Sequence, residues 1–147
     1  MTDDKIIEQF LYWAKKFKIK KLYISKDDDT IYAAYVTETF TRVPVIFYNK
    51  EHINDYANDR LFTSVAFHEL GHVKYKTSRY RSNSSIKHKI KSEYLAEKYS
   101  LMMHKKYCKK NVNHLIKYSR AMIDDTEWAK LWPIHAKAFR KVYGELK

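Results

Sequence analysis

The chain has 147 residues, of which 45% are hydrophobic and 16% aromatic, and its formal net charge is +12. A chain of this size can bury one core, so we expect a single domain over residues 1–147. Its one cysteine, Cys108, excludes an internal disulfide and a cysteine-rich metal site, and is typical of a reducing compartment. Because it has neither an apolar run of about 18 residues nor a basic and apolar signal region, we expect a cytoplasmic protein that does not cross a membrane.

The first predicted element is a helix over residues 3–17. Its apolar residues recur with helical spacing and form one stripe, namely Ile6, Ile7, Phe10, Leu11, Ala14 and Phe17. We expect Thr2 to cap this helix, because a threonine hydroxyl at that position can accept a hydrogen bond from a backbone N–H of the first turn.

Three β-branched and aromatic runs follow, at residues 22–24, 31–36 and 45–48, and we interpret them as strands. The polar residues 26–29 are predicted to form a hairpin turn between the first two strands. Pro44 fits the first residue of the third strand, where its missing N–H costs least. These runs predict a small sheet that is mainly antiparallel or mixed.

The most informative stretch is His68-Glu69-Leu70-Gly71-His72. Two histidines four residues apart on a helix direct their imidazoles at one metal ion, and zinc readily accepts neutral imidazole nitrogen. Glu69 lies between them, where its carboxylate can act as a base toward a water molecule at the metal. Apolar residues at 61, 62, 65 and 66 keep helical spacing into the motif, so we expect a half-buried helix with Asn58 or Asp59 as its N-cap.

A catalytic zinc site needs a third protein ligand, which here must come from another element. Residues 91–103 have the apolar spacing of a second buried helix, on which Glu93 and Glu97 are one turn apart and share a face. One of them can bind zinc while the other receives the N–H of a ligating histidine. His88 and His104 are weaker alternatives as ligands.

Further helices are predicted over residues 112–122 and 126–131, and a last one opens at Pro133. The order of elements is therefore a helix, a small sheet, the motif helix, the glutamate-bearing helix and extra C-terminal helices. This order predicts an α+β protein.

The two motifs, His68–His72 and Glu93–Ser100, together resemble those of ImmA/IrrE-type zinc metallopeptidases, which are minimal gluzincins of the HExxH class. In that family the second motif reads approximately E-x-x-A-[N/D]-x-F-A. Ala96 matches this pattern, whereas Glu97 stands where an asparagine or aspartate is usual. The resemblance implies a zincin-like fold, in which the sheet packs on the two metal-binding helices.

The resemblance also implies one zinc ion per chain, held by His68, His72 and Glu93. Glu97 is then an alternative ligand or the partner of a ligand. The expected reaction is hydrolysis of a peptide bond, in which Glu69 takes a proton from water and delivers it to the leaving amine.

Two further parts of a peptidase site have candidates in the sequence. A donor to the developing oxyanion is expected downstream of the ligand glutamate, and the candidates are Tyr107, His104, His114 and Tyr118. In related folds the strand before the motif helix is a sheet edge that pairs with an extended substrate. Here that edge strand is predicted to be formed by Val45, Ile46, Phe47 and Tyr48.

The implied function is that of a zinc-dependent endopeptidase, a hydrolase that cleaves a cytoplasmic protein such as a DNA-binding repressor of a phage or mobile element. Two alternatives stay open: a SprT-like protease acting on DNA-bound proteins, and a non-catalytic zinc-binding interaction protein.

Basic residues gather in segments 15–21, 79–91 and 105–110, which makes nucleic acid a candidate partner beside the protein or peptide substrate. The residues do not indicate an oligomeric state.

Overall fold

The computed structural model describes residues 1–76 and 84–144. The chain divides into two compact units, Met1–Arg79 (unit 1) and Tyr80–Lys147 (unit 2). Over the described residues it contains seven α-helices and three strands, so the α+β class predicted from the sequence is confirmed. The single domain and the zincin-like fold stay predictions.

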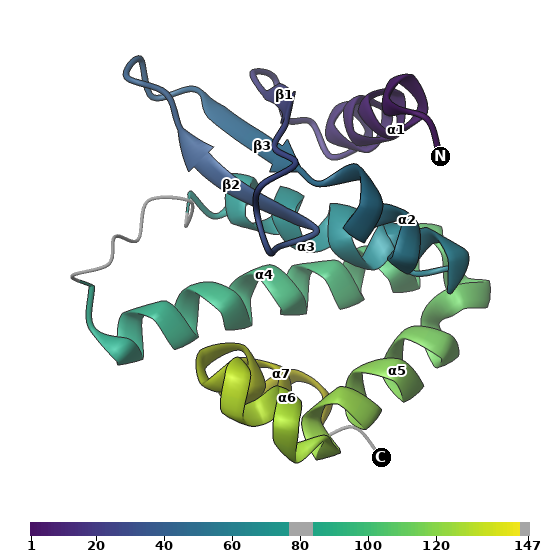
Figure 1. Ribbon diagram of the computed structural model, residues 1–147, viewed down its shortest axis with the longest axis vertical. Coiled ribbons are helices and arrows are strands. Elements are labelled where there is room, and N and C mark those ends of the chain that lie inside the picture. Colours follow the sequence, from purple (N-terminus) through teal and green to yellow (C-terminus); the bar gives the residue numbers. More distant parts are fainter. Residues whose placement is uncertain (77–83, 145–147) are drawn as a thin grey trace. The chain divides into compact units, whose positions relative to one another are not determined.

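Unit 1 begins with helix α1, Asp3–Lys16, which Figure 1 shows beside the strands. Thr2 caps it as predicted, since the Thr2 hydroxyl accepts a hydrogen bond from the backbone N–H of Lys5 at 3.3 Å. Two aspartates in the first turn and two lysines in the last turn complement the helix dipole. Ile6 and Phe10 of the predicted stripe are fully buried, so this stripe is the face that α1 turns toward the core.

The sheet of unit 1 has three strands, β1 (Tyr23–Lys26), β2 (Ala34–Glu38) and β3 (Pro44–Tyr48). Their order is β1-β3-β2, with β1 parallel to β3 and β2 antiparallel to it. The sheet is therefore mixed, and Pro44 is the first residue of its third strand as predicted.

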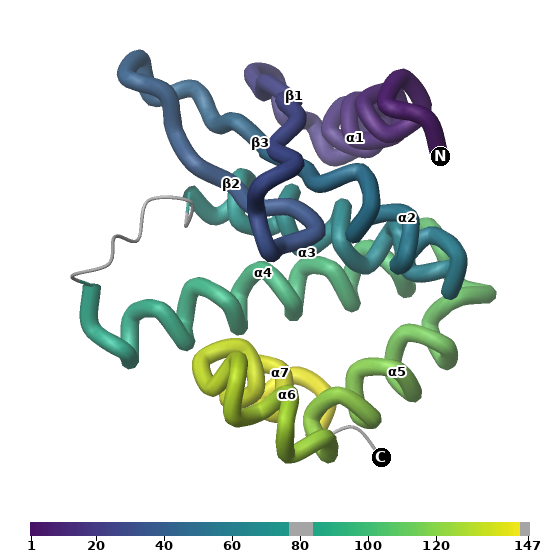
Figure 2. Tube along the Cα trace, in the orientation of Figure 1, coloured from purple at the N-terminus to yellow at the C-terminus, as the bar shows by residue number. Residues whose placement is uncertain are grey.

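The predicted hairpin turn at residues 26–29 is wrong. β1 and β2 lie on opposite sides of β3, so the chain after β1 crosses to the other edge of the sheet, a path that can be followed in Figure 2. The hairpin joins β2 to β3 instead, where the N–H of Thr39 donates to the carbonyl of Val43 at 2.9 Å. A run of aspartates marks a turn in the sequence, but it does not say which strands pair across it.

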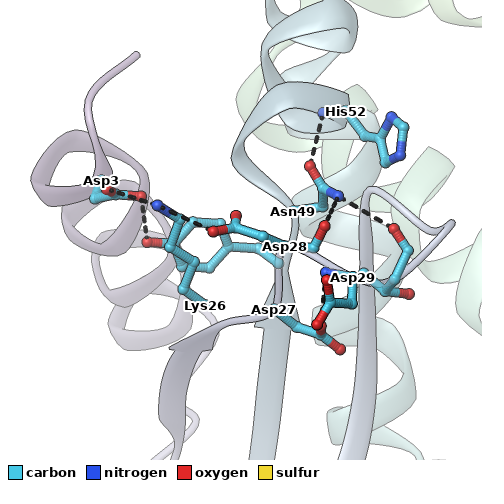
Figure 3. A network of polar contacts seen from close by, with 9 residues as sticks. Asp3, Lys26, Asp27, Asp28, Asp29, Asn49 and His52 are labelled. Carbon is cyan, nitrogen blue, oxygen red and sulfur yellow. Dashed lines mark hydrogen bonds and ion pairs between the residues drawn. The ribbon is translucent and has the colours of Figure 1, made fainter.

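Asn49 holds the connection between β1 and β2 against the next helix (Figure 3). Its side-chain nitrogen donates to the carbonyls of Asp28 at 3.2 Å and Thr30 at 3.1 Å. Its side-chain oxygen accepts from the N–H of His52 at 3.2 Å and so caps helix α2, Lys50–Asn58. One buried amide therefore fixes the end of β3, the start of α2 and the crossing connection.

Asp27 in the same connection is stabilised in its charged form. The Tyr35 hydroxyl donates to Asp27 Oδ2 at 2.7 Å, and the backbone N–H of Asp29 donates to Asp27 Oδ1 at 3.1 Å. These hydrogen bonds, the one from Tyr35 above all, lower the pKa of the Asp27 carboxyl. Burial and the contact with Asp27 raise the pKa of Tyr35 to about 12.

We expect Tyr35→Phe to lower the stability of the fold at neutral pH but not in strong acid. A carboxyl with a depressed folded pKa contributes stability above its unfolded pKa of about 4, and this contribution is lost as the pH falls through the folded value. Urea unfolding at both pH values measures the effect, with Tyr23→Phe as control because Tyr23 is 59% exposed. An equal loss of stability at both pH values would contradict the role given to Asp27.

Helix α3, Phe62–Lys74, carries the two histidines of the motif. Its N-cap is Leu61, which makes no side-chain capping bond, and the predicted caps Asn58 and Asp59 are wrong. Asn58 is the last residue of α2 and Asp59 is the C-cap of that helix. The sequence prediction missed α2 because this short helix buries a single residue, Ile53, and so has no apolar stripe.

The position of α3 in unit 1 is fixed by aromatic contacts with α1 and by packing against β2. The ring of Phe10 lies 5.5 Å from that of Phe62, and the ring of Phe17 lies 5.0 Å from that of Phe67, both edge to face. Lys74 at the end of α3 donates to the carbonyl of Phe17 at 3.0 Å. The motif helix is thus held at both ends by the first helix of the chain.

Unit 2 is helical. Its elements are α4 (Ile86–Tyr107), a short 3-10 helix η1 (Lys109–Asn111), α5 (Val112–Asp124), α6 (Thr126–Leu131) and α7 (Pro133–Tyr143). The predicted helices are confirmed, and α4 is longer than expected at both ends. The buried apolar core of unit 2 comes from α4, α5 and α7. It consists of Leu101, Leu115, Ile123, Ala138, Phe139, Val142 and Tyr143.

Over residues 1–76 and 84–144, no helix is both long enough and apolar enough to cross a membrane.

Candidate metal centre

Unit 1 places the residues of the first motif together on one buried part of α3. His68 and Glu69 are each 8% exposed and His72 is 5% exposed. The two imidazole rings have centroids 4.9 Å apart and meet edge to face, and a ligand nitrogen of one lies within 4.8 Å of a ligand nitrogen of the other. This follows from the helix, because residues four apart share a face. The two histidines predicted as ligands therefore lie together within one helix, and Glu69, the predicted base, is buried next to them; their roles stay predictions.

Unit 2 places Glu93 and Glu97 on the same face of α4, as predicted, and each is 2% exposed. A buried carboxylate is costly unless it has partners, and α7 supplies one to each of them. Glu93 Oε2 lies 3.4 Å from Nε2 of His135. Glu97 Oε1 accepts a hydrogen bond from the hydroxyl of Tyr143.

Tyr143 is fully buried beside Glu97, and this makes the pair part of the core of unit 2. Burial is the main cause that raises the pKa of the Tyr143 phenol, and the negative charge of Glu97 adds to it. The phenol therefore stays protonated and remains a donor to the carboxylate. Glu97 therefore belongs to a buried hydrogen-bonded pair with Tyr143 in the interior of unit 2.

Among the described residues, unit 1 offers the buried imidazoles of His68 and His72 as candidate ligands, and unit 2 offers the buried carboxylate of Glu93. Two imidazole nitrogens and one carboxylate oxygen are a ligand set that zinc takes in catalytic sites, whereas calcium and magnesium prefer oxygen alone. The chemistry of this set fits the zinc ion that the sequence predicts. Glu97 differs from Glu93 in its partner within unit 2, the hydroxyl of Tyr143, and its role as an alternative ligand stays a prediction.

Two of the four predicted oxyanion donors lie on α4 far from Glu93. His104 is eleven residues further along the helix and Tyr107 fourteen, which at about 1.5 Å per residue is about 16 Å and 21 Å along the axis. His104 is also fully buried, its Nδ1 lies 2.7 Å from the carbonyl of Ser100, and burial lowers its pKa. These two residues are poor donors at an ion held by Glu93.

The other two predicted donors, His114 and Tyr118, are half-buried on α5, one turn apart. Their role stays a prediction. His88, the weaker alternative as a ligand, is exposed in the first turn of α4.

His135 was missed by the sequence prediction. Its position on α7, between Trp132 and Phe139, follows the apolar spacing of that helix, where a histidine is unexpected. This break in the pattern is the signal that could have indicated it. Its partner Glu93 could not be inferred, because their contact depends on how α7 packs against α4.

The predicted substrate edge formed by Val45, Ile46, Phe47 and Tyr48 is wrong. β3 is the central strand, with β1 hydrogen-bonded on one side and β2 on the other, so an added peptide strand has no place on it. The sheet edge that packs against the motif helix is β2. The sequence of β3 has no polar alternation, which is typical of a strand with both faces covered, and Val45 and Ile46, on opposite faces, are both buried.

The basic segments are distributed over both units. Residues 15–21 include the end of α1 in unit 1, and residues 105–110 include the end of α4 and part of η1 in unit 2. Part of the third segment, residues 79–83, lies outside the described residues. Binding of nucleic acid by these segments stays a prediction.

Comparison of the chain with models of protein families, with curated proteins and with solved structures finds no match.

Proposed function

We propose that the protein is a zinc-dependent endopeptidase of the ImmA/IrrE type, in which His68, His72 and Glu93 hold one zinc ion and Glu69 is the catalytic base. The observation that carries the proposal is the buried group on α3, where two histidines share a face and a glutamate is buried next to them. Glu93 adds the carboxylate of a zinc ligand set. A purely structural zinc site would have no use for Glu69.

A bound zinc ion would supply Lewis acidity, which polarises the scissile carbonyl and lowers the pKa of a water molecule. The residues of the chain supply the proton transfer. A carboxylate oxygen of Glu69 accepts the proton of the attacking water and then delivers it to the nitrogen of the leaving amine. Burial of Glu69 limits competing contact of this base with bulk solvent.

The substrate of the proposed reaction is an extended segment of a cytoplasmic protein. β2 supports this proposal, because it is an edge strand and packs against α3, which carries the catalytic base. An extended peptide can add to such an edge by main-chain hydrogen bonds. A DNA-binding repressor of a phage or mobile element is the substrate that the family resemblance suggests.

Zinc content and hydrolysis together test this function. We expect about one zinc ion per chain after purification with metal present, and loss of the metal in His68→Ala, because two ligands alone hold zinc weakly. His52→Ala is the matched control, since His52 lies on α2 outside the motif, and it should retain the zinc ion. Cleavage of repressor candidates should stop with a chelator and return with added zinc. A wild-type protein without zinc would overturn the proposal.

A further inference from the structure

α7 places a histidine against the proposed carboxylate ligand within unit 2. His135 Nε2 lies 3.4 Å from Glu93 Oε2, and the two side chains are 27% and 3% exposed. A carboxylate that binds a metal through one oxygen still has a second oxygen, whose hydrogen bond fixes the orientation of the group. The contact with His135 is therefore of the kind that would set how Glu93 is presented to an ion.

The ring of His135 is itself held by packing. The ring of Trp132 lies 5.7 Å away, edge to face, and that of Phe139 lies 6.5 Å away on the other side along the helix. Phe139 belongs to the buried core of unit 2, so one side of the imidazole packs against that core. Packing on both sides along the helix restricts the rotamers of His135, which favours the contact of Nε2 with Glu93.

Glu97 provides a comparison on the same pair of helices. Its partner Tyr143 is fully buried in the core, and the contact offsets the cost of a carboxylate in the interior. His135, by contrast, is partly exposed, and an apolar side chain at its position would continue the stripe of Trp132 and Phe139. Packing alone therefore does not account for a histidine there, whereas the contact of Nε2 with the Glu93 carboxylate does.

We propose that His135 is a positioning residue, which holds the Glu93 carboxylate in the orientation that zinc binding requires. This inference rests on the proposed function, because it takes Glu93 as a zinc ligand. Its consequence is that the zinc affinity depends on α7 as well as on the two helices that carry the ligands.

Zinc affinity of the full chain, measured by competition with a chromophoric chelator, tests the inference. His135→Ala should bind zinc about 10- to 100-fold more weakly than the wild type, which is the usual effect of losing the partner of a ligand. His135→Gln should recover most of the affinity, because the glutamine amide places an N–H near the position of Nε2. Lys137→Ala, an exposed substitution on the same helix, is the matched control and should bind like the wild type.

The melting temperature of the zinc-free protein separates positioning from stability. It should change little in His135→Ala, whereas Tyr143→Phe should lower it and leave the zinc affinity closer to that of the wild type. Unchanged zinc affinity in His135→Ala would overturn the inference, and so would a loss of affinity that Gln does not restore. If the wild type itself held no zinc, the proposed function would fail instead, so the two failures are distinguishable.

Discussion

Glu69→Gln should retain the zinc ion and the fold and lose at least about 100-fold of the rate of peptide hydrolysis. Glutamine has nearly the same shape as glutamate but cannot accept a proton at pH 7, so the substitution removes the base without removing a ligand. The loss should appear in kcat, because the proton is transferred in the transition state and not in substrate binding.

The measurement compares cleavage of a verified substrate by the wild type and by Glu69→Gln, with the zinc content of both determined on the same samples. Glu51→Gln is the matched control, because Glu51 is an exposed glutamate in the first turn of α2. Cleavage by Glu69→Gln at the wild-type rate would show that the proposed mechanism is wrong.

Glu93→Ala should weaken zinc binding by more than about 100-fold, a larger loss than the 10- to 100-fold expected for removal of a ligand's partner. Glu97→Ala should weaken it less and should mainly destabilise unit 2. The reason is that Glu97 accepts the hydrogen bond of the fully buried Tyr143 hydroxyl. Glu97 is the acceptor for the Tyr143 O–H, and the side chain of Ser119 also hydrogen-bonds to this phenol. Leaving the buried O–H without its acceptor costs about 1–3 kcal/mol of the free energy of unfolding.

Chelator competition and urea unfolding of the zinc-free proteins measure the two effects separately. The double variant Glu97→Ala with Tyr143→Phe removes both the donor and the acceptor of the Tyr143–Glu97 hydrogen bond. It should recover part of the stability lost in Glu97→Ala. A greater loss of zinc affinity in Glu97→Ala than in Glu93→Ala would reverse the assignment of the third ligand.

The helices that the sequence predicts well are those with a continuous apolar stripe. In α1 the stripe includes the buried Ile6, Phe10 and Ala14, and the Thr2 cap is a local signal as well. α2 lacks such a stripe and was missed. The sheet order was not predictable, because β1 pairs with β3 and not with β2, its neighbour in sequence, and this pairing depends on contacts between distant residues.

In the candidate site, too, local spacing was predictable from the sequence and contacts between distant elements were not. His68, Glu69 and His72 are set by helical spacing alone, so the sequence was sufficient to predict that they lie together. Glu93 and Glu97 were predicted to share a face for the same reason. What distinguishes the two glutamates is the partner that each receives from α7, and no pattern within α4 carries that information.

During biosynthesis, α4 is made before α7, which supplies the partners of its two buried glutamates. α4 leaves the ribosome first, and the carboxylates of Glu93 and Glu97 then remain in water until His135 and Tyr143 have also been synthesised. Because domains tend to fold as units during synthesis, Glu93 and Glu97 can gain these partners only after α7 has emerged. A nascent chain that stops before Pro133 therefore carries the whole HExxH motif but has neither of the contacts that α7 gives to the two glutamates.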